Sequence, residues 1–151
     1  MLDSKNENRL SSFFFETAEK YARLKIETTT PQNEKFISII EFKDIHGIHL
    51  MDINPHQNLL TSIIRTSPDK FYDQFIDYLK PQEIINGNIS PTNMLFSYNN
   101  KNEFIKTLKK LSLTCFSIES EWGLYGFIIA AHAKTTVNNK IHSQSRDKIF
   151  T

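Results

Sequence analysis

The chain has 151 residues, 39% of them hydrophobic and 12% aromatic, and its formal net charge is +1. This length suits one domain, and a composition with twelve Phe excludes the class of disordered chains. The nearly balanced charge argues against a surface built throughout to hold polyphosphate. The single cysteine, Cys115, cannot form an internal disulfide, which indicates a reducing compartment.

The chain lacks the sequence features of export. Its first twenty residues carry acids and amides rather than a long apolar stretch, so they do not resemble a signal peptide. The longest apolar run, residues 122–133, is far shorter than the roughly 20 residues that span a bilayer. We therefore expect a cytoplasmic protein.

The first predicted elements are a helix and a hairpin. Apolar residues recur at i, i+3, i+4 and i+7 from Leu10 to Leu24, which predicts a helix over about residues 6–26. "KFISIIEFK" (35–43) is rich in β-formers and predicts a strand. "DIHG" is typical of a turn, and residues 48–53 are expected to return as the partner strand.

Two segments then have a capping residue before a proline, a pattern typical of helix starts. In the first, Asn54 precedes Pro55, and Leu59, Leu60, Ile63 and Ile64 form the apolar stripe. In the second, Ser67 precedes Pro68 and Pro81 ends the helix; its apolar stripe comprises Phe71, Tyr72, Phe75, Ile76 and Leu79. The sequence thus predicts consecutive helices that begin at these two prolines.

The remaining elements alternate. A short extended piece with turns surrounds Gly87 and Pro91, and "MLFSY" (94–98) predicts a strand. Asn100 followed by Glu103 resembles a capping box and opens a helix. Residues 112–120 and 124–134 are expected to be the final strands, joined through "EWG", with Gly123 in the turn.

Helices grouped against hairpins predict a single α+β domain over residues 1–133. Its mainly antiparallel sheet, with about 5–6 strands, would be covered by about four helices. Residues 134–151 are polar and basic and show no apolar period, so we expect a tail that is dispensable for folding. Gly126, inside the last strand, indicates a bulge or a closely packed neighbour.

Two groups of residues could carry chemistry. His46, His49 and Asp52 suggest a metal site, but strand alternation places His49 on the face opposite to the other two. We therefore expect no metal, and no motif indicates a cofactor. The second group, whose members lie on adjacent predicted strands, could form a hydrolase or transferase site; it comprises Cys115, Glu119, Ser120, Glu121 and His132. No nucleophile elbow or oxyanion loop accompanies it.

Basic residues suggest a third use of the surface. Lys106, Lys109 and Lys110 lie on one predicted helix, and the tail adds Lys134, Lys140, Arg146 and Lys148. Aromatic side chains are not interleaved with these charges, as a stacking platform for bases would require. A solvated face is the simpler interpretation, and nucleic-acid binding is the alternative.

The helix predicted over 67–80 has the most suggestive surface. Asp69, Asp73 and Asp77 recur every four residues and form an acidic ridge, although like charges at this spacing cost a helix a few tenths of a kcal/mol. Tyr72, Tyr78 and Glu83 lie near the ridge in the sequence. Acidic and tyrosine side chains together suit docking onto a basic protein, with a solvent-facing helix side as the plainer alternative.

In length and composition alone, the chain is similar to small cytoplasmic bacterial inhibitors such as toxin immunity proteins. No motif is shared, so the resemblance implies no site residues. The sequence therefore favours a non-catalytic protein-binding or inhibitor protein that docks a basic partner through the ridge. A small cofactor-free hydrolase or transferase and a nucleic-acid accessory protein are the alternatives.

Overall fold

The computed structural model describes residues 2, 5–52, 59–60, 62–79, 82–84, 87–89, 94–120 and 124–138. The helices in these residues are α1 (Pro68–Gln74), α2 (Ile76–Leu79) and α3 (Lys101–Lys110). The strands are β1 (Glu7–Glu16), β2 (Tyr21–Thr29), β3 (Lys35–Met51), β4 (Leu59–Leu60), β5 (Ser62–Thr66), β6 (Gln82–Ile84), β7 (Gly87–Ile89), β8 (Thr114–Glu119) and β9 (Tyr125–Asn138).

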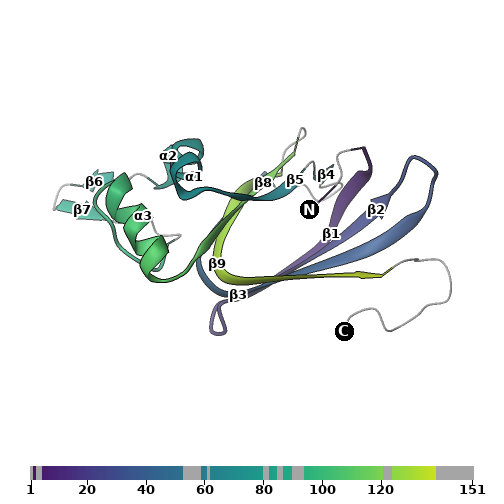
Figure 1. The fold of residues 1–151 in the computed structure, drawn as a ribbon, viewed down its shortest axis with the longest axis horizontal. Coiled ribbons are helices and arrows are strands. Elements are labelled where there is room, and N and C mark those ends of the chain that lie inside the picture. Colours follow the sequence, from purple (N-terminus) through teal and green to yellow (C-terminus); the bar gives the residue numbers. More distant parts are fainter. Residues whose placement is uncertain are drawn as a thin grey trace.

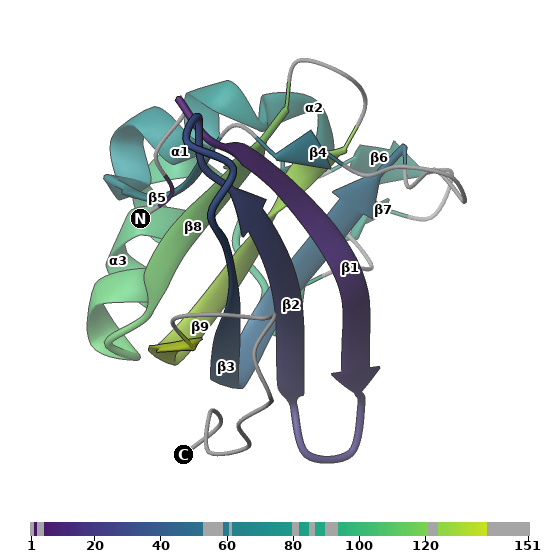
Figure 2. The ribbon, with the colours of Figure 1, turned by 90° about the vertical axis from the view of Figure 1, so that its right-hand side faces the viewer.

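Seven strands form one antiparallel sheet in the order β4-β1-β2-β3-β9-β8-β5, and β6 and β7 form a separate pair. The end strands of the sheet, β4 and β5, follow each other in the chain. The sheet therefore curls until its two ends approach and becomes a nearly closed barrel (Figures 1 and 2). The expectation of an α+β layer fold covered by about four helices is wrong, because most of the described chain is strand.

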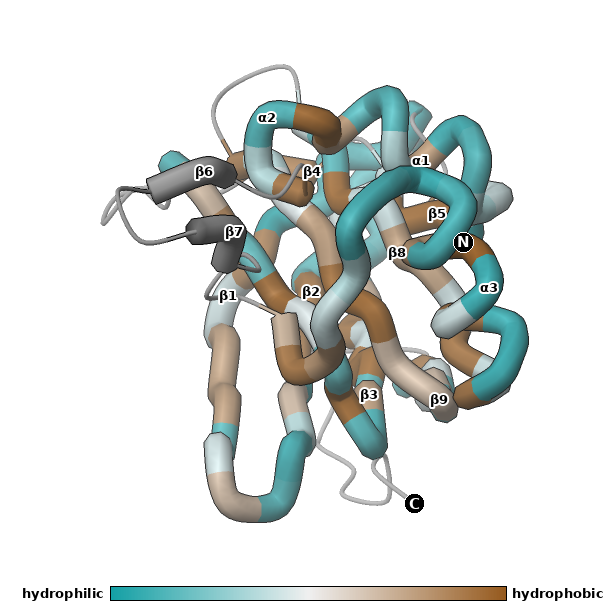
Figure 3. The backbone as a smooth tube through the Cα atoms, turned by 90° about the vertical axis from the view of Figure 1, so that its left-hand side faces the viewer, coloured by the Kyte–Doolittle hydropathy of each residue, from teal (hydrophilic) through white to brown (hydrophobic). Residues whose placement is uncertain are grey.

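Two apolar cores lie on opposite sides of the barrel wall. The first fills the interior and includes Leu24, Ile40, Phe42, Phe116 and Ile128. The second lies between the outer face of β8 and β9 and the helices, and includes Phe71, Phe75, Phe104, Cys115 and Phe127. All three helices gather at one end of the molecule, while β1 and β2 lie at the other (Figure 1). Hydrophobic residues recur along β3 and β9, and the turns of α1 are mainly hydrophilic (Figure 3).

The helix predicted over residues 6–26 is wrong, since this segment forms the β1–β2 hairpin. A register shift between Leu10 and Ser12 inserts an extra residue into β1. Leu10 and Phe13, three residues apart, consequently both pack against the barrel core. The bulge thus gives a strand the spacing that is typical of a helix.

The predicted hairpin over residues 35–53 is also wrong, because β3 continues through "DIHG" without turning back. Its first half pairs with β2, and its whole length from Ile37 to Met51 pairs with β9. A register shift between Ile45 and Gly47 bends the strand instead of reversing it. Met94 forms a bridge to Gly47 at this bend, and a Cβ atom on Gly47 would stand 2.5 Å from the Met94 sulfur, so glycine leaves room for that side chain.

The apolar stripe at residues 59–64 belongs to strands and not to the predicted helix. Leu60 of β4 and Ile63 of β5 are both buried in the barrel core, three residues apart, where the chain passes from one edge of the sheet to the other. Asn54 and Pro55 lie outside the described residues. The strand predicted over residues 94–98 reduces to a single bridge between Met94 and Gly47.

Two helix predictions are confirmed. Pro68 opens α1 after Ser67, although Ser67 makes no side-chain capping bond, and the predicted helix is split at Phe75 into α1 and α2. The capping box at α3 forms: the Glu103 N–H donates to Asn100 Oδ1 at 2.9 Å. The Glu103 carboxylate in turn accepts from the Asn99 N–H at 2.7 Å.

The last two strands are confirmed, and β9 is longer than expected. It continues through residues 135–138, the first part of the expected tail, and pairs there with Ile37–Ile40 of β3. Residues 139–151 lie outside the described part, as does Gly123. At Gly126, a Cβ atom would stand 1.9 Å from the His49 carbonyl oxygen, which confirms the predicted close approach of a neighbouring backbone.

Candidate functional site

The acidic ridge lies on the outward side of α1 and α2. Asp69 and Asp73 keep 69% and 61% of their side chains exposed, and Asp77 is exposed on α2. The opposite side of the same helices carries Phe71 and Phe75, whose rings contact each other and Phe127 at centroid distances of 5.0–5.2 Å. The ridge is therefore attached to the rigid core that joins the helices to the sheet.

Lys101 at the start of α3 bridges the first two members of the ridge. Its Nζ lies 2.8 Å from Asp69 Oδ1 and 2.9 Å from both carboxylate oxygens of Asp73. The hydrogen bond to Asp69, followed by the weaker contribution of the one to Asp73, raises the pKa of Lys101 above its ordinary value. Lys101 offsets part of the charge of these two carboxylates. Together with exposed Asp77 and exposed Lys70, this surface carries three negative and two positive charges.

The other predicted contact residues have different positions. Tyr72 is buried, and its ring lies 5.2 Å from Phe104 and 6.3 Å from Tyr98, so it belongs to the core. Tyr78 is exposed on α2 with one face against His49, at a centroid distance of 4.5 Å. Glu83 belongs to β6, and its side chain lies outside the described part.

Ile76 is an exposed apolar residue that the sequence reasoning assigned to the buried stripe of the helix. The break at Phe75 changes the direction of the chain between α1 and α2, which turns Ile76 outward beside Asp77 and Tyr78. Helical periodicity assumes one unbroken helix, so it could not have found this residue. The exposed surface thus combines three carboxylates with one aliphatic and one aromatic side chain.

The histidines of the candidate metal group have separate surroundings. His46 Nε2 lies 3.2 Å from Asp44 Oδ1, whereas His49 packs between Tyr78 and Phe127. Burial lowers the pKa of His49, and its Nε2 is buried without a hydrogen-bond partner. Within the described ranges, no group of three His, Cys, Asp or Glu side chains is placed to hold a metal ion.

Of the residues proposed for a hydrolase or transferase site, Cys115, Glu119 and His132 do not come together. Cys115 is buried in the core under the helices, and burial raises the pKa of its thiol to about 12, so the thiolate is scarce at neutral pH. Glu119 lies beside Tyr125, because Ile118 pairs with Gly126. His132 is seven residues farther along β9, a separation of about 23 Å in a strand. Glu121 lies outside the described residues.

Glu119 instead takes part in a polar contact beside the acidic ridge. Its carboxylate accepts a hydrogen bond from Gln74 Nε2 at 2.8 Å. The same Gln74 side chain accepts from Ser117 Oγ at 3.3 Å, and Ser117 Oγ lies 2.7 Å from Thr66 Oγ1. These contacts join the end of α1 to β8 and β5, and they fix the position of the ridge relative to the sheet.

The predicted basic group lies on a different helix from the ridge. Lys106, Lys109 and Lys110 are exposed on α3, where the last two stand in the final turn and favourably oppose the negative end of the helix dipole. Lys134 is exposed on β9. Lys140, Arg146 and Lys148 lie outside the described residues.

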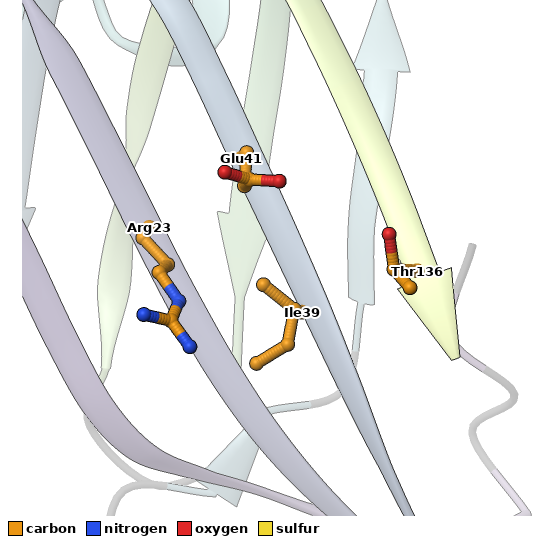
Figure 4. A pocket seen from close by; sticks show the side chains of 4 residues that line it. All are labelled: Arg23, Ile39, Glu41 and Thr136. Atoms are coloured by element: carbon orange, nitrogen blue, oxygen red, sulfur yellow. The ribbon is translucent and has the colours of Figure 1, made fainter. Parts of the chain in front are cut away.

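A shallow hollow of about 160 Å³ lies on the outer face of the sheet, at the end away from the helices. Its walls are Arg23 from β2, Ile39 and Glu41 from β3, and Thr136 from β9 (Figure 4). The Glu41 carboxylate also accepts a hydrogen bond of 2.5 Å from the Tyr21 hydroxyl. Pockets that enclose a small-molecule ligand usually measure about 300–1,000 Å³, so this hollow is too small to bury a substrate.

Comparison with protein-family models, with curated proteins and with solved structures gives no match. In the part of the chain that the structure describes, none of the helices has the length and apolar character needed to cross a bilayer.

Proposed function

We propose that this protein is a non-catalytic binding protein, of the inhibitor or immunity type, that docks a basic protein on the outward side of α1 and α2. The observation that carries the proposal is the surface on which Asp69, Asp73 and Asp77 stand exposed beside Ile76 and Tyr78. Carboxylates accelerate encounter with a basic partner, and exposed apolar or aromatic side chains supply contact energy after encounter.

Rigidity of this surface supports the proposal. The aromatic cluster beneath the helices and the ion pairs to Lys101 hold the side chains in place before any partner arrives. Little conformational entropy would therefore be lost on association. The bridging Lys101 also separates the roles of the charges, because Asp77 has more freedom to meet a cationic group than the two bridged aspartates.

The test uses variants that change the charge of the α1–α2 surface in opposite directions. Asp73→Lys combined with Asp77→Lys replaces attraction by repulsion, while Lys101→Gln leaves Asp69 and Asp73 without their cation and strengthens the negative field. Each variant and the wild type would serve as bait in a nuclease-treated lysate of the source cells, at low and moderate salt. A retained protein would then be purified for measurement of association rates.

We expect a basic protein that the wild type retains, that the double reversal loses, and that associates about tenfold more slowly with the double reversal. With Lys101→Gln it should associate faster than with the wild type, and both differences should shrink as salt screens them. Glu19→Lys combined with Glu34→Lys makes the same change in charge as the double reversal, in the turns before and after β2; it is the matched control and should bind normally. Equal retention and equal rates for all variants would remove α1 and α2 from the interface.

A further inference from the structure

Within the described residues, the second half of β1 forms an open edge of the sheet. On one side, β1 pairs with β2 from Glu7 to Glu16. On its other side, β4 covers it only at Asn8 and Arg9. Among the strands that the structure describes, none pairs with the outer side of residues 11–16, and this half of β1 forms the outer margin of the sheet in Figure 2.

This edge is unusually apolar for an exposed strand. Its sequence is "SSFFFE", with Phe14 51% exposed and Phe15 also exposed. Phe14 lies opposite Arg23 on the outer face of the sheet, where its ring is 6.2 Å from the ring of Tyr21. Phe13 and Phe15 are opposite Leu24 and Ala22 and face the barrel side.

Natural proteins protect such edges with lysine, proline, an inward charge or a covering segment, because open backbone groups pair with other chains. The far part of β9 shows this protection. Beyond Ala130, the last residue paired with β8, it presents exposed His132, Lys134 and Thr135. Residues 11–15 of β1 contain no charge and no proline. Beyond the bulge between Leu10 and Ser12, residues 12–15 thus lack the charged side chain that protects the other margin.

We infer that the edge of β1 is a pairing site for the same edge of a second copy of this chain. The two copies are related by a two-fold axis through Phe14, so that β1 runs antiparallel to β1 of the other copy. The interface is then isologous and closes as a dimer. Pairing of β1 with β9 of another copy would instead be open-ended, and would set the apolar strand against the charged one.

The alternation of side chains between the two faces of β1 agrees with an axis at Phe14. Residues directly opposite each other in an antiparallel pair share a face of the sheet. An axis at Phe14 sets Phe14 against its own copy on the outer face, and sets Phe13 against Phe15 on the barrel side. Ser12 then meets Glu16, so neither of the two Glu16 carboxylates faces a like charge. An axis moved to Phe13 leaves one aromatic pair, on the barrel side, and sets Phe14 against Ser12. An axis moved to Phe15 also leaves one aromatic pair, on the barrel side, and sets Phe14 against Glu16.

The test is the mass of the full chain in solution, measured by sedimentation and light scattering from about 1 to 200 μM. We expect a concentration-dependent dimer for the wild type. Phe14→Lys and Phe14→Glu each place like charges opposite each other, and each should weaken dimerisation at least tenfold. An equimolar mixture of the two variants places lysine opposite glutamate and should restore the dimer as a heterodimer.

Val137→Lys is the matched control, since Val137 is an equally exposed apolar residue, at 53%, on β9. It should leave the dimer unchanged, and circular dichroism should show that all variants are folded. A wild type that stays monomeric to 200 μM would overturn the inference, as would a dimer that Phe14→Lys leaves intact. Failure of the lysine and glutamate variants to combine would equally overturn it, because they meet only if Phe14 lies on the axis.

Discussion

The preference of His49 for its neutral form follows from the layer in which β3 places the side chain. In β3 it points to the helix side, where the rings of Tyr78 and Phe127 lie 4.5 and 5.8 Å from its own. No charged side chain is among these ring contacts, and Nε2 is buried without a partner. The neutral imidazole therefore suits this site, and burial lowers its pKa.

Stability should depend on pH through this histidine. Because the pKa is lower in the folded state, the unfolded chain takes up the proton first as pH falls. The contribution of neutral His49 is fully present above its unfolded pKa of about 6.5 and is lost as pH falls through the folded value. We expect urea midpoints of the wild type to fall between pH 7 and pH 5 more than those of His49→Phe. Parallel pH profiles for the two proteins would contradict this role.

At the scale of one element, α3 shows which local signals act independently of the fold. Asn100 and Glu103 satisfy N–H groups at the start of the helix that would otherwise lack partners. Phe104 and Leu108 then bury one face against the second core. The helix is therefore specified twice, by its cap and by its apolar face, and both signals are local in the sequence.

Loss of the cap should have a defined effect on stability. Asn100→Ala removes the acceptor for the Glu103 N–H and should lower the free energy of unfolding by about 1 kcal/mol. Asn99→Ala is the matched control, because Asn99 contributes only its backbone N–H to this network. It should change the stability by less than about 0.5 kcal/mol. Urea denaturation measures both, and equal effects would mean that the capping bond contributes nothing of its own.

At the scale of the whole molecule, the long pairing of β3 with β9 joins the two ends of the structure. At one end of this pair, near Gly126 and Leu50, the strands lie under the helices. At the other end, residues 135–138 pair with Ile37–Ile40. Ile39 and Ile40 are buried, one on each face of the sheet. The far part of β9 therefore covers apolar β3 residues that lie outside the helical half.

Two shortened chains would separate the end of β9 from the residues after it. A chain ending at Asn138 keeps every described pair of β3 with β9, and we expect its melting midpoint to stay within a few degrees of the full chain. A chain ending at Lys134 loses the partners of Ile37–Ile40, and its midpoint should fall by about 10 °C, since 1 kcal/mol corresponds to roughly 2–4 °C in a domain of this size. Equal midpoints would show that these pairs do not stabilise the sheet.

The candidate surface was only partly predictable from the sequence. Asp69, Asp73 and Asp77 are exposed, as the sequence predicted. The spacing of four explains this for Asp69 and Asp73, which share a side of α1, whereas Asp77 lies beyond the break, on α2. The bridge from Lys101 could not be foreseen, since it joins residues 28 and 32 positions apart through helix packing. Tyr72 is buried, as its place in the apolar stripe predicted and contrary to its expected place on the contact surface, because it packs against Phe104. Ile76, from the same stripe, is exposed because the helix breaks at Phe75.

The sequence by itself determined the elements whose signals are local: α3 with its cap, the start of α1 at Pro68, the last two strands, and the close backbone approach at Gly126. Tertiary structure decided the rest. The bulge after Leu10 and the passage from β4 to β5 gave strands a helical spacing of apolar residues. Closure of the barrel buries the apolar side chains of these strands. The free energy of this burial outweighs the local preference for a helix, because it grows with the apolar area removed from water.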